Sequence, residues 1–155
     1  MLGKTHLVGG LIAGALIVPY VTTSSSELFI ACAGLGALLP DIDSPNSLFG
    51  RKIKPISYLI QSTMGHRGIF HSLFIAAVLF IALQILLPNY ALAITIGYLS
   101  HLLLDMLTPS GVPLFWPLSF NISLPVVKTG SLVEKIIFYP LTVWCGLLIF
   151  NISIF

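Results

Sequence analysis

The chain has 155 residues, of which 57% are hydrophobic and only 8% are charged, and its net charge is +2. Soluble globular domains carry roughly 25% charged residues. This composition, with a mean hydropathy of +1.03, therefore excludes a water-soluble protein and predicts one integral-membrane domain over residues 1–155. The few basic residues form no cluster of the size that nucleic-acid binding needs, so we expect membrane lipids and no nucleic acid as partners.

Apolar stretches separated by breakers predict an all-α, polytopic membrane helix bundle of about five transmembrane helices. The stretches run from about Leu7 to Val21, Leu28 to Leu39, Ser72 to Leu87, Tyr90 to Leu107 and Ile136 to Phe155. Twelve residues reach only about 18 Å as a helix, so the second stretch needs residues 24–27 as well to complete a crossing of the bilayer.

Two connections are longer than turns require. Residues 41–71 contain the run from Pro55 to Met64, which we expect to form a short helix at the membrane interface, and residues 108–130 are rich in proline, glycine and aromatic residues. Ser131 and Glu134 match the capping-box pattern, which predicts that the last helix begins there.

The basic residues predict the orientation. With five crossings, every Lys and Arg falls on the side of the amino terminus, namely Lys4, Arg51, Lys52, Lys54, Arg67, Lys128 and Lys135. The positive-inside rule then makes the amino terminus cytoplasmic and the carboxyl terminus external, in a multi-pass protein of the bacterial inner (plasma) membrane. For Arg51, Lys52 and Lys54, contact with anionic lipid is the simpler role.

All four His and all three Asp fall on that same side: His6, Asp41, Asp43, His66, His71, His101 and Asp105. The orientation comes from Lys and Arg alone, so this convergence is an independent observation. It predicts a site at the cytoplasmic interface, where lipid headgroups and carbonyl groups lie.

The spacing of these residues favours joint binding of a cation. His101 and Asp105 are four residues apart, so they share one helix face, at a depth where ionisable groups are costly unless they are paired or face a polar cavity. Asp41 and Asp43 follow Pro40 and present two carboxylates in one turn. Gly68 permits the tight turn that would bring His66 and His71 together.

Seven nitrogen and oxygen ligands exceed the needs of one tetrahedral zinc. The mixed set suits two or three divalent metal ions, with zinc as first choice and manganese or iron as alternatives. Taken singly, each feature has a simpler explanation: His6 as a headgroup contact, Asp41 and Asp43 as turn residues, and His101 with Asp105 as a hydrogen-bonded pair. Their convergence favours the metal site, and Arg67 is placed to contact a phosphate.

Three blocks of sequence resemble the YdjM-like family of bacterial inner-membrane proteins, which are described as metal-dependent hydrolases. They are Leu39-Pro-Asp-Ile-Asp-Ser-Pro45, Gly65-His-Arg-Gly-Ile-Phe-His-Ser72 and the run from Gly97 to Pro117, within a match from His6 to about Pro125. The resemblance implies that His6, Asp41, His66, His71, His101 and Asp105 form the metal centre, with Asp43 as a further ligand or an orienting group. The family is more distantly similar to zinc phospholipase C and P1-type nucleases through the His-x-x-x-Asp element, which implies phosphoester hydrolysis.

The leading hypothesis is a membrane-bound, metal-dependent hydrolase of a lipid-linked ester or phosphoester, with Asp43 as base or orienting group and Arg67 holding a phosphate. The alternative is a metal-binding membrane protein without turnover, a divalent-cation sensor or carrier, although a carrier should place its ligands near the bilayer midplane. In a third hypothesis the His and Asp pairs only hold helices together.

Overall fold

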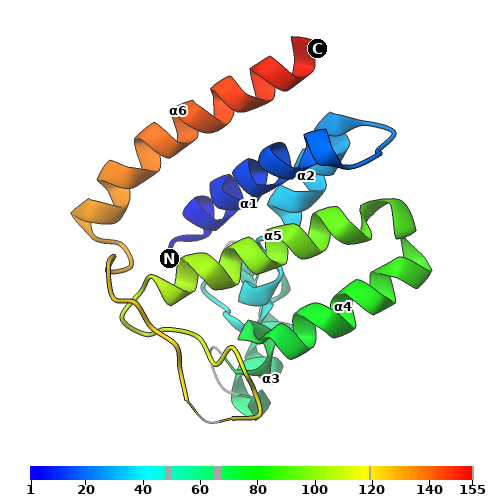
Figure 1. Ribbon diagram of the computed structural model, residues 1–155. Helices are drawn as coiled ribbons and strands as arrows, with labels where there is room; N and C mark the ends of the chain where they lie inside the picture. The colour runs from blue at the N-terminus through cyan, green and yellow to red at the C-terminus, as the bar shows by residue number, and fades with distance from the viewer. Residues whose placement is uncertain (48–49, 65–67, 119, 155) are drawn as a thin grey trace.

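The computed structural model describes residues 1–47, 50–64, 68–118 and 120–154, and these are helical apart from connections (Figure 1). The helices are α1 (Gly3–Ile17), α2 (Ser26–Gly36), α3 (Lys54–Met64), α4 (Leu73–Leu86), α5 (Pro88–Met106) and α6 (Leu132–Ile154). Short 3-10 turns η1 (Val18–Tyr20), η2 (Pro40–Asp43), η3 (Gly50–Ile53) and η4 (Ile69–His71) lie between them. The described residues contain no strand, so the all-α prediction is confirmed.

Each expected apolar stretch forms a helix, and α3 is the short helix expected within residues 41–71. α1 starts at Gly3 rather than Leu7, whereas α6 starts at Leu132, directly after Ser131, where the capping-box pattern placed the start of the last helix. In both cases the helix takes in polar residues ahead of the apolar stretch, because His6 and Glu134 are buried inside the protein.

The helices differ in their ability to cross a bilayer. Among the described residues, one helix is long and apolar enough for a crossing, over Leu132–Ile152 of α6, and Leu73–Leu86 forms a shorter apolar helix. With 1.5 Å per residue, the 15 residues of α1 and the 11 of α2 reach about 22 Å and 16 Å, against a hydrocarbon core of about 30 Å. The five-span arrangement therefore stays a prediction.

Small residues let α1, α2 and α5 pack closely. A Cβ atom at Gly97 of α5 would lie 1.8 Å from the carbonyl oxygen of Ala33 in α2, and one at Gly36 of α2 would lie 2.2 Å from that of Ile94 in α5. Only glycine permits such an approach of two backbones. The close contact brings the end of α2, and η2 after it, beside the last turns of α5.

α6 lies along α1 at one side of the molecule, and α4 lies along α5 at the other (Figure 1). Cys145 of α6 packs on Val8 and Ile12 of α1, whereas Val143 and Leu147 on the other face of α6 are exposed, as befits side chains that face lipid. The beginning of α1, the end of α5 and the beginning of α6 meet at one end of the bundle (Figure 1), and the polar residues gather there.

Candidate metal centre

Six of the seven predicted metal ligands converge at this end of the bundle. α1 supplies His6, η2 supplies Asp41 and Asp43, η4 supplies His71, and α5 supplies His101 and Asp105. All are buried with exposures of at most 1%, apart from Asp41, whose side chain is 17% exposed. The seventh predicted ligand, His66, and the predicted phosphate contact, Arg67, lie outside the described residues.

Asp105 lies at the centre of the cluster and uses its two oxygens in different directions. Its Oδ1 atom is 3.3 Å from Nε2 of His6 and also accepts from the amino group of Met1. Its Oδ2 atom is 3.6 Å from Nε2 of His101 and 3.8 Å from Nε2 of His71. One carboxylate therefore joins donors from α1, η4 and α5.

His101 is held in one orientation by the backbone of α2. Its Nδ1 atom lies 2.8 Å from the carbonyl oxygen of Ala37, and because a carbonyl can only accept, Nδ1 must donate. In the neutral ring, Nε2 then carries the lone pair, which is the usual arrangement of a metal-binding histidine. Nε2 of His101 lies 3.3 Å from Nε2 of His71 and 3.9 Å from Oδ1 of Asp41.

The separations between donor atoms are those of ligands around a metal rather than of hydrogen bonds. Two donors bound to one tetrahedral zinc at about 2.0–2.1 Å lie about 3.4 Å apart, whereas hydrogen bonds between N and O span about 2.7–3.2 Å. The donor separations here run from 3.3 Å between His6 and Asp105 to 3.9 Å between His101 and Asp41.

Buried ring nitrogens support the same interpretation. Among the described residues, neither nitrogen of His6 has a hydrogen-bond partner, nor does Nδ1 of His71, although Oδ2 of Asp43 lies 3.4 Å from that Nδ1. A buried polar atom without a partner is costly, and the His6 ring is also stacked on that of His101, with centroids 3.6 Å apart. A metal ion bound at Nε2 of His6, which lies 3.3 Å from Oδ1 of Asp105, would give that buried nitrogen a direct ligand bond.

The donors form two groups that could each hold a metal ion. One consists of His6, His101 and Asp105, and the other of Asp41, His71 and His101, with the ligand atoms of each group within 4.8 Å of one another. His101 belongs to both groups, but its Nδ1 donates to the Ala37 carbonyl, so its single lone pair on Nε2 could bind an ion in only one of the two positions at a time. The residues present therefore fit the divalent metal centre that the sequence predicts.

Comparison with known proteins places the chain in a family. The model of the family described as "YdjM inner membrane protein" matches residues 1–154. The chain belongs to this family. It is 40% identical over 139 residues to the "Inner membrane protein YdjM" of Escherichia coli (strain K12), which covers 84% of this chain and 71% of that protein. It is also 37% identical over 145 residues to "Uncharacterized protein YvsG" of Bacillus subtilis (strain 168), covering 92% of this chain and 90% of that protein.

Family membership supports the inner membrane as the location of this YdjM-family chain. No solved structure matches it. The similarity to zinc phospholipase C and P1-type nucleases is therefore not shown, and it stays a prediction.

Glu134 has a role in this YdjM-family protein that the sequence did not indicate. The expected capping box is only half formed, because Ser131 Oγ accepts from the Glu134 amide at 3.3 Å while the carboxylate turns elsewhere. Its Oε1 accepts from the amide of Leu2 at 2.7 Å and from the hydroxyl of Thr5 at 2.8 Å, and its Oε2 accepts from the amide of Gly130 at 2.6 Å. α6 thus caps α1, whose N-cap residue Leu2 provides no side-chain cap, and holds the first turn that carries His6.

Tyr98 is a second supporting residue that the sequence analysis missed. It lies one turn before His101 on α5, it is buried, and its hydroxyl donates to the carbonyl of Phe70, the residue before His71. The contact fixes η4 against α5. A tyrosine in an apolar helix carries no spacing signal that would have revealed this role.

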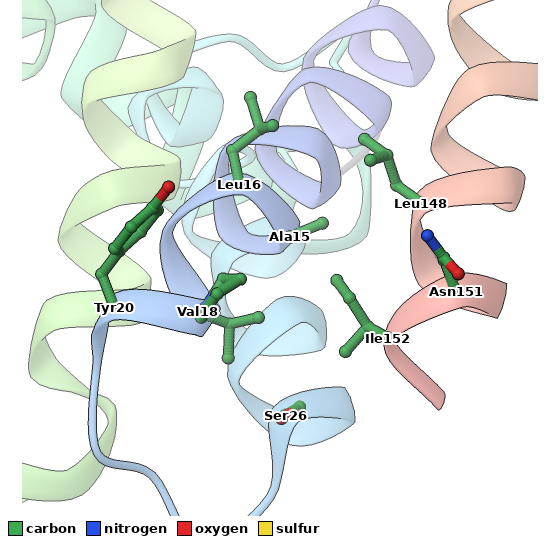
Figure 2. A pocket seen from close by; sticks show the side chains of 9 residues that line it. Ala15, Leu16, Val18, Tyr20, Ser26, Leu148, Asn151 and Ile152 are labelled. Atoms are coloured by element: carbon green, nitrogen blue, oxygen red, sulfur yellow. The ribbon is translucent and has the colours of Figure 1, made fainter. Parts of the chain in front are cut away.

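A cavity of about 490 Å³ lies at the opposite end of the bundle, between the end of α1, the start of α2 and the last turns of α6. Its walls include Leu16, Leu148 and Ile152, with Ser26 and Asn151 as polar members (Figure 2). None of the predicted site residues lines it, so it is separate from the metal centre.

Proposed function

We propose that this chain is a membrane-bound, metal-dependent hydrolase of a lipid-linked ester or phosphoester, with its metal centre at the cytoplasmic interface. The observation that carries the proposal is the ring of buried His and Asp donors with separations of 3.3–3.9 Å. Such a set is larger than a single structural ion needs, and it includes one partly exposed member, Asp41, through which a substrate can approach.

The residues that would hold the metal are His6, Asp41, His71, His101 and Asp105, with His66 as the further ligand expected from the sequence. Two or three zinc ions are our first choice, and manganese or iron the alternatives. A metal pair supplies a polarised water as nucleophile and charge stabilisation for the leaving oxygen.

The other groups act through the protein itself. Oδ2 of Asp43 faces Nδ1 of His71 at 3.4 Å, a position that favours the orienting role over that of a general base, because the carboxylate lies behind the ring relative to Nε2. The Ala37 carbonyl does the same for His101. Arg67 keeps the role expected from its sequence position, that of holding a phosphate group.

We further propose five crossings with a cytoplasmic amino terminus. The ends of α2 and α5 and the starts of α1, α4 and α6 carry or adjoin the cluster, as expected if successive helices alternate in direction (Figure 1). All seven Lys and Arg then lie on the cytoplasmic side.

Metal content and turnover test this function together. Purified protein should contain at least one equivalent of divalent metal by elemental analysis and should cleave a fluorogenic phospholipid or lipid ester. The variants His101→Ala and Asp105→Ala should lose both. Ser100→Ala is the matched control, because Ser100 neighbours His101 on α5 and its hydroxyl only bonds the carbonyl of Gly97. Hydrolysis at the wild-type rate in both cluster variants would contradict the proposal.

The second candidate is metal binding without turnover, as in a divalent-cation sensor or carrier. The near-complete burial of five of the six donors favours it, because a resident ion needs no access for substrate. Full metal occupancy with no cleavage across ester and phosphoester substrates would support this candidate, and ion flux in proteoliposomes would identify a carrier.

A further inference from the structure

Two cavities with different walls meet at the amino-terminal segment, next to the metal centre. One, of about 220 Å³, has a mixed wall, with the start of the chain on one side and the polar residues Asp41, Ser44, Asn46, Ser47 and Thr129 on the other; it is called the polar cavity below. The other, of about 190 Å³, lies between α1, α5 and α6. Met1 lines both cavities, so a short stretch of chain is all that separates them.

The wall of the second cavity is apolar throughout its exposed surface. It is built from Leu104 of α5, Leu107 directly after α5, Val126 and Val127 of the long connection, and Ile137 and Leu141 of α6. Thr5 and Glu134 also border it. The Thr5 hydroxyl donates to Oε1 of Glu134 at 2.8 Å, so these polar atoms face each other and only carbon atoms of the two residues face the cavity.

The connection that forms one wall is anchored rather than loose. The amides of Val126 and Val127 both donate to the carbonyl of Leu107 at 3.0 Å, and the amide of Leu124 donates to that of Met106 at 2.6 Å. Val127 is 3% exposed on the inner side, while Val126 and Ile137 are 68% and 40% exposed at the rim. The rim therefore includes α6, the helix best suited to cross the membrane.

The apolar cavity adjoins the metal donors directly. Leu104 precedes Asp105 in the chain, Leu107 follows it by two residues, and the amino group of Met1 contacts the Asp105 carboxylate. On the polar side, Asp41 Oδ1 lies 3.9 Å from Nε2 of His101. A molecule that occupied both cavities would pass beside the His and Asp cluster, with its polar part in the cavity next to Asp41 and its apolar part in the apolar cavity.

We propose that the apolar cavity binds part of one acyl chain of a membrane phospholipid whose headgroup linkage lies in the polar cavity beside Asp41. About 190 Å³ is below the roughly 300–1,000 Å³ of pockets that enclose a drug-sized ligand, which suits a segment of a single chain. The inference rests on the proposed function only in naming this lipid as the substrate. It adds the site that selects the chain, with Leu107 and Ile137 as its determining residues.

Photolabelling tests the site without relying on turnover. The full-length protein is reconstituted in vesicles of phosphatidylethanolamine and phosphatidylglycerol that contain a phosphatidylglycerol with a diazirine in its acyl chain. After irradiation, peptide mass spectrometry should find label on half-buried Leu107 and buried Val127, as well as on exposed Val143 of α6. Label on exposed residues of α6 without label on Val127 would overturn the proposal.

Substitutions that fill the cavity sharpen the test. Leu107→Trp should abolish labelling of Val127 and leave that of Val143 unchanged. Ile137→Trp, at the half-exposed rim, should also abolish labelling of Val127, because the larger side chain blocks entry to the cavity. This second variant keeps the test valid if Leu107→Trp fails to fold. The matched control is Leu103→Trp, because Leu103 lies in the last turn of α5, one turn before Leu107, but is 62% exposed. Undiminished label on Val127 in both cavity variants would overturn the assignment.

The two proposals fail separately. Label on Val127 with no hydrolysis of any lipid would contradict the proposed hydrolase and support the acyl-chain site. Hydrolysis with equal rates for short-chain and long-chain phospholipids, and no label on Val127, would support the hydrolase and overturn the site.

Discussion

Individual side chains in the cluster divide into those that would bind metal and those that orient them. Asp105 contacts three histidines through its two oxygens, and its removal affects every part of the site. Asp43 is different, because among the described residues its Oδ2 lies 3.4 Å from Nδ1 of His71, on the side of the ring away from Nε2. Hydrogen-bonding partners of metal-bound histidines tune affinity rather than create it.

We therefore expect Asp43→Asn to keep the fold and the metal, but with weaker binding. Loss of such an orienting partner lowers metal affinity by about 10- to 100-fold, since the amide leaves His71 without a negative charge behind its ring. A competition titration against a chelator measures the change. His71→Ala serves as comparison and should bind at least one ion fewer. Equal affinity in Asp43→Asn and the wild type would show that Asp43 does not orient His71.

Helices position the cluster through two contacts that lie outside it. The cap from α6 holds the first turn of α1, and the close approach of α2 to α5 sets the Ala37 carbonyl against His101. The holding groups, the Glu134 carboxylate and the Ala37 carbonyl, are not themselves metal donors, although the Ala37 carbonyl accepts from the donor residue His101. Loss of either contact should therefore change the metal site indirectly, by moving the helix that carries the metal donors.

Glu134→Ala removes the carboxylate that accepts from Leu2, Thr5 and Gly130. Loss of a helix cap costs about 0.5–2 kcal/mol, and here it also frees the turn that carries His6. We expect a lower unfolding temperature together with weaker metal binding. Glu134→Gln should recover part of both, because its amide oxygen can still accept from Leu2 and Thr5. Thr142→Ala is the control on the same helix, where the hydroxyl only bonds Phe138.

Gly97→Ala tests the approach of α2 to α5. The added methyl group would lie 1.8 Å from the carbonyl oxygen of Ala33, so the helices must separate, and overpacking of this kind costs about 1–3 kcal/mol. Gly146→Ala in α6 is the matched control, because a Cβ there meets no atom within 4 Å, and it should stabilise by up to about 1 kcal/mol through helix propensity. Thermal unfolding in detergent compares the two, and equal melting temperatures would contradict the packing interpretation.

For the whole molecule, the cluster joins segments that are distant in sequence. It draws α1, η2, η4 and α5 to one end of the bundle. A ligand that binds only the folded state stabilises it by about 2.7 kcal/mol when its concentration is 100 times its Kd. We therefore expect a chelator to lower the unfolding temperature of the wild type and to have no effect on His101→Ala. An equal decrease in both would mean that the chelator acts elsewhere.

The sequence predicted the apolar helices, which follow from local patterns, and six of the residues that the structure brings together, whereas His66 lies outside the described residues. Apolar stretches between breakers gave α1, α2, α4, α5 and α6, and the uneven distribution of charge brought His6 together with Asp105. The sequence did not reveal the roles of Glu134 and Tyr98, because their partners Leu2 and Phe70 lie 132 and 28 residues away in the chain. No spacing rule connects residues so far apart. The half-formed capping box shows the same limit, because the Glu134 carboxylate accepts from the distant start of α1 and not from the local Ser131 amide.

Whether α2 crosses the membrane decides between five crossings and fewer, and with them the predicted orientation of the chain. If α2 crosses despite its 11 helical residues, Ser24 before it and Asn46 after it lie on opposite sides, with Asn46 cytoplasmic. Each can be replaced by Cys in a chain in which Cys32 and Cys145, which are both free, are first changed to Ala. In intact cells an impermeant maleimide should label Ser24→Cys at once and Asn46→Cys only after the membrane is permeabilised. Labelling of both positions from outside would mean that α2 does not cross. A crossing by so short a helix would require the bilayer to become thinner around it, and that requirement would then disappear.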